Sequence, residues 1–317
     1  MDGRLNPVEG GPTLTGDQIR DIARPLLSDG QWAIFIDQKD VDFAFSWMDR
    51  ARIRGSLFTQ KGEPALSLRV IPSKIPDFET LGLPAVANWV AAQPRGFVLV
   101  TGPTGSGKST TLASIVDRIN STRAAHILTI EDPVEYVHRH RMSAVTQREI
   151  GLDSPSFDRA LRSALREDPD VLLIGEMRDI DSIQLALTMA ETGHLVFATL
   201  HTNDAPQAID RIIDVFPAGE KPMVRSMLSE SLRAVISQSL LKKVGGGRIA
   251  AHEIMVGIPA IRNLIREDKV AQMYSSIQTG QQFGMQTLDQ TLLDLVKRGL
   301  VTRQEASTYA KNKDAFK

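Results

Sequence analysis

The chain has 317 residues, 42% of them hydrophobic and 24% charged, which is the composition of an ordinary globular protein with a substantial core. Its formal net charge of -1 gives no global attraction to nucleic acid, and the absence of cysteine excludes disulfides, thiol nucleophiles and cysteine-ligated zinc. The apolar runs are too short to span a bilayer and the N-terminus has no signal-peptide pattern, so we expect a cytoplasmic protein.

The first region, residues 1–72, is expected to combine a helix with antiparallel strands. A helix-like stretch at 17–27 precedes two segments, 50–59 and 65–72, in which apolar residues mostly alternate with polar ones. The sequence KGEP between these segments is typical of a hairpin turn. The proline-containing stretch that follows predicts a linker over 73–84.

Residues 85–257 alternate short apolar runs with amphipathic segments, a pattern typical of an α/β domain with a parallel sheet covered by helices. The segment 238–255 predicts two strands joined by a glycine turn, and residues 258–317 are expected to be mostly helical. The predicted buried strands lie at 96–102, 126–132, 170–176 and 194–200.

A phosphate loop is the strongest signal in the chain. GPTGSGKS at 102–109 matches the pattern G-x-x-x-x-G-K-[ST] in full, follows a predicted buried strand and opens a predicted helix. Lys108 is expected to reach the β- and γ-phosphates of ATP, and the Ser109 hydroxyl to ligate Mg²⁺. A chance glycine-rich turn is the alternative, which the context disfavours. The expected nucleotide contacts are Gly102, Pro103, Thr104, Gly105, Ser106, Gly107, Lys108, Ser109 and Thr110.

Acidic residues follow two of the predicted strands. Glu176 ends the strand at 170–176, where it can organise Mg²⁺ and water, although a helix-terminal carboxylate is the plainer alternative. Glu131, Asp132 and Glu135 end another strand, and any of them can act as general base for hydrolysis. Spacing alone leaves the choice among these three open, and a solvated acidic turn is also compatible with it.

Two histidines bracket the strand at 194–200. His194 and His201 are roughly 23 Å apart in an extended chain, so a single metal ion cannot bind both. His201 is expected at the nucleotide edge, donating to the γ-phosphate or to Glu176. His194 lies at the opposite end, where it either couples to a neighbouring domain or is structural.

Seven segments of this chain carry a family resemblance: GPTGSGKSTT, TIEDPVEY, ALREDPDVLLIGEMRD, AETGHLVFATLHTND, RSMLSESLRAVISQSLL, GGGRIAAHEIM and AIRNLIRE. The first four resemble the secretion ATPase superfamily, and the last three are similar to the pilus retraction ATPases within it. The resemblance implies a RecA-like P-loop ATPase domain over 85–257 and a PAS-like α+β domain over 1–72. It further implies a homo-hexameric ring with ATP bound at subunit interfaces, powering twitching motility.

The resemblance also implies residue roles. Glu135 falls on the catalytic base, Glu176 on the Walker B glutamate, and His194 and His201 on the His-box pair. Arginines of the N-terminal domain approach the phosphates from another domain or subunit, and the matching positions are Arg52, Arg54 and Arg69. The polar face of AIRNLIRE is implied to serve retraction, although by itself it reads as an ordinary amphipathic surface helix. That face carries Arg262, Asn263, Arg266 and Glu267.

Partners and location follow from the same resemblance. An inner-membrane platform protein and an accessory retraction ATPase are the expected partners, with the motor peripheral at the inner membrane and no nucleic acid bound. The lack of cysteine favours the retraction branch, because the related secretion and assembly ATPases carry a four-cysteine zinc module. The alternatives are a nucleic-acid translocase or helicase on the same fold, which the charge disfavours, and a regulator that barely hydrolyses ATP.

The N-terminal domain is also shorter than is usual in the family, by roughly a quarter of its expected size. We therefore expect a mis-assigned or internal start codon. The intact mass of the protein from its native source, compared with 34.9 kDa for this chain, tests that expectation.

Overall fold

The computed structural model describes residues 7–8, 10–48, 51–72, 74–177 and 179–316. The chain divides into two compact units, Met1–Lys74 and Ile75–Lys317, which are described separately below. No helix within the described residues is both long enough and apolar enough to cross a membrane.

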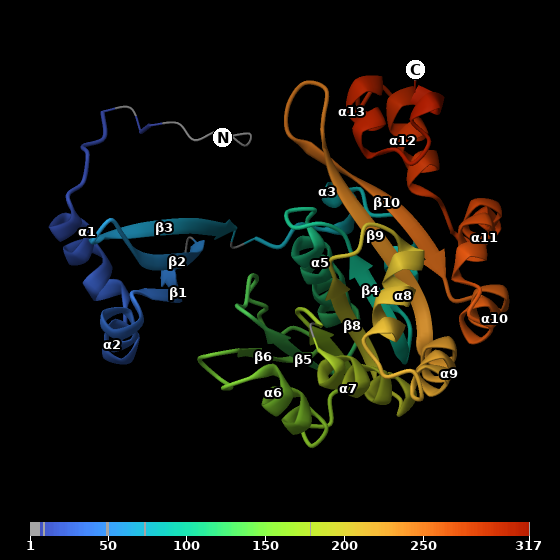
Figure 1. Ribbon diagram of the computed structural model, residues 1–317, viewed down its shortest axis with the longest axis horizontal. Coiled ribbons are helices and arrows are strands. Elements are labelled where there is room, and N and C mark those ends of the chain that lie inside the picture. Colours follow the sequence, from blue (N-terminus) through green and yellow to red (C-terminus); the bar gives the residue numbers. More distant parts are fainter. Residues whose placement is uncertain (1–6, 9, 49–50, 73, 178, 317) are drawn as a thin grey trace. The chain divides into compact units, whose positions relative to one another are not determined.

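The first unit is a three-stranded antiparallel sheet in the order β1-β2-β3, with its helices on one face (Figure 1). Its core joins helix residues such as Phe35 to strand residues such as Phe43 and Leu57. The predicted helix over 17–27 is divided in two, because Pro25 cannot continue the hydrogen-bonding of the first helix. The elements are α1 (Gly16–Ala23), η1 (Arg24–Leu26), α2 (Asp29–Gln38), β1 (Asp40–Trp47), β2 (Ala51–Gln60) and β3 (Glu63–Pro72).

The two predicted alternating strands of this unit are β2 and β3, and they pair in antiparallel register through the expected turn. Lys61 and Gly62 form that turn with positive φ values of 52° and 86°, the conformation that matches the twist of a tight hairpin. Neither α2 nor β1 was predicted from the sequence, although apolar and polar residues alternate in the β1 sequence DVDFAFSW as they do in β2 and β3.

The second unit is built on a seven-stranded sheet in the order β10-β9-β4-β8-β7-β5-β6. All neighbouring strands are parallel except β10, which is antiparallel to β9 as the predicted hairpin requires. The four strands predicted to be buried form its centre, and their middle residues are buried on both faces of the sheet. The strands are β4 (Gly96–Thr101), β5 (His126–Glu131), β6 (Ala144–Glu149), β7 (Val171–Ile174), β8 (Leu195–Leu200), β9 (Leu232–Lys242) and β10 (Arg248–Val256).

Strand order fixes where a ligand can bind. The chain leaves β4 for β5 in one direction along the sheet, and leaves β8 for β9 in the other. Right-handed crossovers therefore place α5 on one face and α8 on the other, which opens a crevice at the carboxyl ends of β4 and β8 (Figure 1). The helices before and between these strands are α3 (Phe78–Leu81), α4 (Val86–Ala91), α5 (Lys108–Thr122), α6 (Phe157–Ala164), α7 (Ile180–Glu191), α8 (Ala205–Asp214) and α9 (Lys221–Ser231).

The segment 73–84, expected as a linker, contains a helix that is part of the second unit. Phe78 in α3 is 4% exposed and belongs to the main core, and Asp77 caps the helix through a 2.8 Å hydrogen bond from the Thr80 N–H. The apolar residues of this short stretch thus pack onto the domain instead of spanning a gap.

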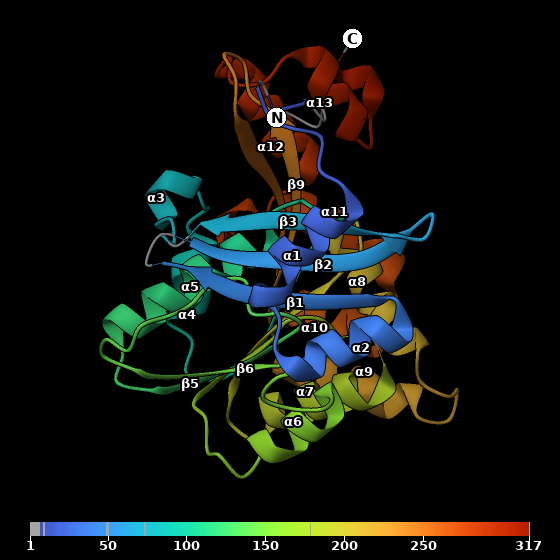
Figure 2. The same ribbon diagram turned by 90° about the vertical axis from the view of Figure 1, so that its left-hand side faces the viewer.

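The C-terminal region is helical, as expected, and it packs in two places. Ile261, Ile265 and Met273 join the main core, whereas Leu292 and Ala306 form a smaller core with the outer half of the β9–β10 hairpin. Figure 2 shows α12 and α13 around that end of the hairpin. The helices are α10 (Pro259–Arg266), η2 (Val270–Gln272), α11 (Met273–Thr279), η3 (Gln281–Phe283), α12 (Leu288–Lys297), α13 (Arg303–Tyr309) and η4 (Lys313–Phe316).

Candidate active site

The phosphate loop lies between β4 and α5, at the crevice that the strand order creates. Gly102, Gly105 and Gly107 have φ values of 140°, 80° and 92°, which side chains rarely adopt. Space also excludes a side chain at Gly102, where a Cβ would lie 2.2 Å from the Gln238 carbonyl oxygen. A Cβ on Gly107 would lie 2.8 Å from the Gln238 side-chain nitrogen, so Gln238 would have to move. The loop can therefore pass the backbone of β9 at residue 102 only with glycine.

Lys108 extends back over the loop that precedes it. Its ammonium donates hydrogen bonds to the carbonyl oxygens of Gly102, at 2.8 Å, and Pro103, at 3.2 Å. Burial lowers the pKa of Lys108, while the carboxylates of Glu176 and Glu135 act in the opposite direction. A half-buried cation thus lies within the electrostatic reach of two carboxylates from different strands, at the place where phosphate groups bind in a P-loop protein.

Glu176 and His201 follow β7 and β8 and meet at the same edge of the sheet. His201 Nε2 lies 3.0 Å from Glu176 Oε1, and His201 Nδ1 lies 3.5 Å from Lys108 Nζ. Gly175 brings β7 close to β5, since a Cβ there would lie 3.2 Å from the Glu131 Cα. Glycine is therefore favoured at position 175, because a side chain there would crowd β5. The carboxylate that His201 links to Lys108 comes from the next residue, Glu176.

The three carboxylates after β5 occupy different environments. Burial raises the pKa of Glu131 to about 7, even though this carboxyl accepts hydrogen bonds from Thr129, Gln147 and the backbone of Glu135. Asp132 is exposed to solvent and precedes a cis peptide bond to Pro133. Glu135 is the member of the three whose charge acts on Lys108. The charge of Glu135 therefore acts on the lysine of the phosphate loop, whereas the Glu131 carboxyl is buried and has a raised pKa.

Two side chains of β6 brace the turn that carries Glu135. Gln147 Nε2 donates to the Tyr136 carbonyl at 2.8 Å, and the Val134 N–H donates to Glu149 Oε2 at 3.1 Å. The Tyr136 hydroxyl lies 3.0 Å from Thr110 Oγ1 at the start of α5. The turn is thus tied both to the edge strand and to the helix that begins at the phosphate loop.

Gln238 is a further site residue that the sequence interpretation missed. The residue is 4% exposed, and its side-chain amide donates to the Ser106 carbonyl at 2.6 Å and accepts from Thr111 Oγ1 at 2.7 Å. The signal in the sequence was a run of three polar residues, Ser237, Gln238 and Ser239, between apolar residues of β9.

A cavity of about 770 Å³ adjoins the start of α5. Its walls come from the stretch around α3, from the β9–β10 hairpin and from the C-terminal region. This volume falls within the range of ligand pockets of about 300–1,000 Å³, and the cavity touches the phosphate loop at Gly107. It can hold a nucleoside whose phosphates extend onto the loop.

The predicted magnesium ligands, Ser109 and Glu176, present a hydroxyl and a carboxylate oxygen. Mg²⁺ prefers such oxygen donors and completes its octahedral shell with water and phosphate, so a two-residue protein set fits it. Across the described ranges, no cluster of three or more histidine or acidic side chains is arranged to hold a metal ion by itself.

The three predicted arginines lie in the first unit, on the sheet face opposite its helices. Arg54 is directly opposite Arg69 in the β2–β3 register, and Arg52 lies two residues along on the same face. Arg54 is 3.7 Å from Asp42 on β1. The sheet thus brings the three arginines together, while the phosphate loop belongs to the second unit.

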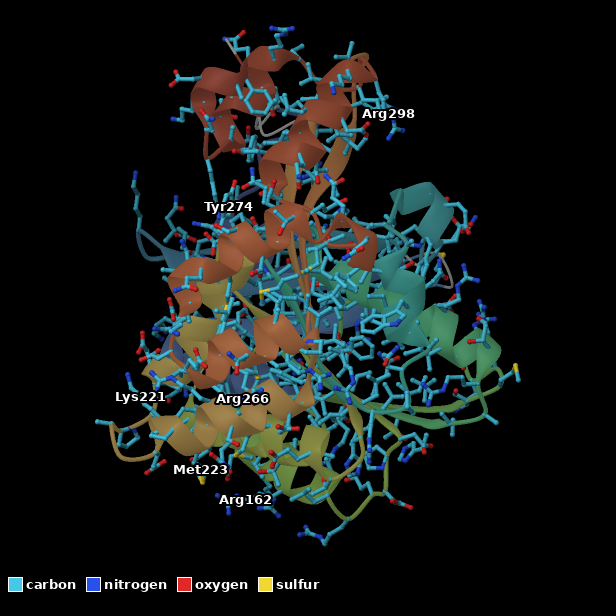
Figure 3. The ribbon with its side chains drawn as sticks, turned by 90° about the vertical axis from the view of Figure 1, so that its right-hand side faces the viewer. Arg162, Lys221, Met223, Arg266, Tyr274 and Arg298 are labelled. Atoms are coloured by element: carbon cyan, nitrogen blue, oxygen red, sulfur yellow. The ribbon has the colours of Figure 1, made fainter. Side chains whose placement is uncertain are left out.

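The residues predicted to couple the nucleotide site to neighbouring domains or partners lie in two elements: His194 precedes β8, and the others belong to α10 or follow it directly. His194 precedes β8, at the end opposite His201, and its Nδ1 lies 2.9 Å from the Met189 carbonyl. In α10, Ile261 and Ile265 are fully buried, and Arg266 pairs with Glu230 at 3.3 Å. Figure 3 shows Arg266 at the surface, close to α9.

The other members of the α10 set make local contacts. Arg262 donates to the Gly257 carbonyl at 2.7 Å, and the Asn263 amide donates to Glu267 at 3.0 Å. The polar face of α10 is therefore ordered by short-range hydrogen bonds while its apolar face is buried.

Comparison with known proteins identifies close relatives. The family model described as type II/IV secretion system protein matches residues 26–308. The chain is 57% identical over 305 residues to the type IV pilus retraction ATPase PilT of Pseudomonas aeruginosa, which covers 96% of this chain and 89% of that protein. It is 53% identical over 306 residues to a twitching motility protein of Neisseria gonorrhoeae, covering 96% of this chain and 82% of the relative.

A solved structure agrees with these sequence relatives. The crystal structure of the pilus retraction motor PilT with bound ADP superimposes with a TM-score of 0.92 at 46% identity, covering 99% of this chain and 90% of that one. The superposition confirms the predicted fold class, a RecA-like α/β ATPase domain preceded by a small α+β domain and followed by a helical segment.

Proposed function

Because this chain belongs to the type II/IV secretion system protein family, we propose that it is an ATPase motor that drives retraction of type IV pili. One observation supports the chemistry above all others: Lys108 of a complete phosphate loop lies 3.5 Å from His201 Nδ1, and His201 Nε2 lies 3.0 Å from Glu176 Oε1. The charges of Glu176 and Glu135 also act on the Lys108 ammonium. The printed functions of the two relatives, pilus retraction and twitching motility, support the cellular role.

Each side chain at the crevice has a role in this proposal. The loop N–H groups and Lys108 hold the β- and γ-phosphates, and the N-terminus of α5 adds its partial positive charge. Glu135 takes a proton from the attacking water, while Glu176 orients that water and is itself held by His201 at 3.0 Å. Magnesium, held by Ser109 and Glu176 together with the phosphates, supplies charge neutralisation when bound.

Arg52, Arg54 and Arg69 complete the site in this proposal. They approach the γ-phosphate from the N-terminal unit of the same or a neighbouring subunit, where an arginine neutralises charge that develops during phosphoryl transfer. Such a site requires assembly, so the proposal includes a homo-hexameric ring with ATP at its interfaces. The proposed domain division is a PAS-like domain at 1–72, a connecting segment at 73–84 whose helix α3 packs on the second unit, an ATPase domain at 85–257 and a C-terminal region at 258–317.

The motor then acts through partners. We place it in the cytoplasm at the inner membrane, bound to a pilus platform protein and assisted by an accessory retraction ATPase. His194 and the polar face of α10, with Arg262, Asn263, Arg266 and Glu267, pass the nucleotide-driven motion to those partners.

Steady-state ATP hydrolysis tests the proposal. Glu176→Gln keeps the size of the side chain but removes its charge, and we expect kcat to fall by about 100-fold or more while ADP affinity changes little. Glu191→Gln, an exposed carboxylate at the end of α7, is the matched control and should hydrolyse ATP like the unchanged protein. Equal rates for Glu176→Gln and the unchanged protein would contradict the assignment.

The cellular role has its own test. Deletion of the gene should abolish twitching, and the unchanged gene, but not Glu176→Gln, should restore it. ATPase activity that rises with added DNA and falls steeply with salt would instead favour a nucleic-acid translocase.

A further inference from the structure

A chain of buried polar contacts leads from the C-terminal region to the phosphate loop. Gln238 on β9 and His252 on β10 are directly paired across the hairpin and are 4% and 3% exposed. His252 Nε2 lies 3.2 Å from Gln238 Oε1, and the Gln238 amide in turn bonds to Ser106 and Thr111. Both residues lie outside the phosphate-loop motif.

The hydrogen-bonding partners fix which atom donates. Gln238 Nε2 must face the Ser106 carbonyl, at 2.6 Å, because only the nitrogen of the amide can donate to it. Oε1 therefore accepts both from the Thr111 hydroxyl, at 2.7 Å, and from the imidazole N–H of His252. Burial lowers the pKa of His252 to about 4, so the ring is neutral at physiological pH and offers a single N–H.

The contact at Ser106 bears directly on phosphate binding. A trans peptide points its C=O and the following N–H in opposite directions. When Gln238 holds the Ser106 carbonyl on the β9 side, the Gly107 N–H must point away from β9. Gly107 has a φ of 92° and no side chain, so its peptide is otherwise easy to rotate.

The other end of this chain of contacts lies before and within α12. The His252 carbonyl accepts from Thr291 Oγ1 at 2.7 Å and from Gln286 Nε2 at 3.0 Å. Gln286 also pairs with Ile254 of β10 through backbone hydrogen bonds of 2.8 and 3.1 Å. His252 thus joins the two ends of this chain of contacts. Its backbone carbonyl binds the C-terminal region, and its ring binds Gln238, which contacts the phosphate loop.

We propose that Gln238 and His252 are positioning residues that hold the phosphate loop in its phosphate-binding conformation, and that Thr291 and Gln286 fix His252 for this task. The proposal rests on the proposed function, since it assigns these residues to the same nucleotide site. The alternative is that the buried contacts stabilise the fold without affecting the loop.

Binding of inorganic pyrophosphate to the full-length chain separates these possibilities. Pyrophosphate binding depends on the phosphate loop alone, whereas ADP also occupies the adjoining cavity, which His252 and Thr291 help to line. Gln238→Met keeps the length of the side chain but removes both amide functions. We expect it to weaken pyrophosphate and ADP binding by the same factor, about tenfold, as measured by calorimetry.

Histidine variants and a control complete the design. His252→Gln retains an N–H donor near the position of Nε2 and should bind pyrophosphate within about twofold of the unchanged protein, whereas His252→Leu should lose about three- to tenfold.

Ser143→Ala removes a different buried hydrogen bond, 2.7 Å to the Arg123 carbonyl, and should lower the melting temperature without changing pyrophosphate affinity. Thr291→Val is a milder, half-buried change that tests the same chain of contacts if Gln238→Met does not fold, and we expect it to weaken pyrophosphate binding by about two- to threefold.

Three results would overturn the proposal. Lower melting temperatures with unchanged pyrophosphate affinity would reduce Gln238 and His252 to structural residues. Weaker ADP binding with unchanged pyrophosphate binding would make them contacts of the nucleoside. If the unchanged protein bound neither ligand, the proposed function itself would fail, which is distinguishable because it does not depend on any variant.

Discussion

His201 lies between two groups of opposite charge. Its Nε2 is 3.0 Å from Glu176 and its Nδ1 is 3.5 Å from the Lys108 ammonium. One tautomer of the imidazole satisfies both, because Nε2–H donates to the carboxylate while Nδ1 accepts from the ammonium. The residue pattern predicted contact with Glu176 or with phosphate, and the structure adds Lys108 as a second partner.

Glu131 leads to a prediction about pH. Its pKa is raised from 4.5 to about 7 by burial, so between these values the folded protein keeps a proton that the unfolded chain releases. The free energy of unfolding should therefore decrease as pH rises from 4.5 to 7. Glu131→Gln removes this dependence, and we expect the variant to be more stable than the unchanged protein at pH 8, by about 1–3 kcal/mol.

Urea unfolding of both proteins across pH 4.5 to 8 measures this effect. The two curves should converge toward the acid end, where Glu131 is protonated in the folded and the unfolded chain. Parallel curves over the whole range would show that the carboxyl is ionised in the folded protein.

Single elements differ in how readily they can be read from sequence. Three of the four central strands, β4, β7 and β8, contain four consecutive apolar residues, which mark a strand buried on both faces. The edge strand β6, with the sequence AVTQRE, was missed because its residues are largely polar. Two of those polar residues, Gln147 and Glu149, hold the turn that carries Glu135, so their function required the strand to be in place.

The helix α10 yields a prediction that separates hydrolysis from retraction. Arg266 lies on its exposed face, in a 3.3 Å ion pair with Glu230, and exposed pairs of this kind contribute about 0–1 kcal/mol. We expect Arg266→Ala to keep its ATPase rate within about twofold and its stability within about 1 kcal/mol, yet to abolish twitching.

Arg162→Ala is the matched control for this prediction. Arg162 is also exposed, in an ion pair with Asp158 at 2.6 Å, and is labelled in Figure 3. The control should twitch normally. A normal twitching zone for Arg266→Ala would remove this residue from the coupling role.

At the scale of the whole molecule, the two units have separate cores. The core of the first unit is centred on Phe35, Phe43 and Leu57. The second unit has its own core and carries the phosphate loop. We expect the fragment of residues 75–317 to unfold cooperatively and to bind pyrophosphate like the full chain. Its ATPase rate should fall by about 10-fold or more, because Arg52, Arg54 and Arg69 are absent from it.

Thermal unfolding, pyrophosphate binding and steady-state hydrolysis measure these three expectations. Arg54→Ala in the full chain should reproduce part of the loss of activity without the change in size. A fragment that hydrolyses ATP as fast as the full chain would show that the arginines take no part in catalysis.

The sequence by itself determined the family, the phosphate loop and the central strands, because each is encoded by contiguous residues whose spacing has a direct physical meaning. It left open which of Glu131, Asp132 and Glu135 faces the lysine. The tertiary structure decided the environments of these carboxylates, because burial and charge depend on neighbours from other strands.

Only the tertiary structure brought Gln238 to the loop. The amide nitrogen of Gln238 and the Ser106 carbonyl are 2.6 Å apart in space but 132 positions apart in sequence. No local pattern encodes such a contact, since it exists only when strand order and register place β9 beside β4. The motif therefore specifies a loop that can bind phosphate, and the fold supplies the neighbours that hold it in shape.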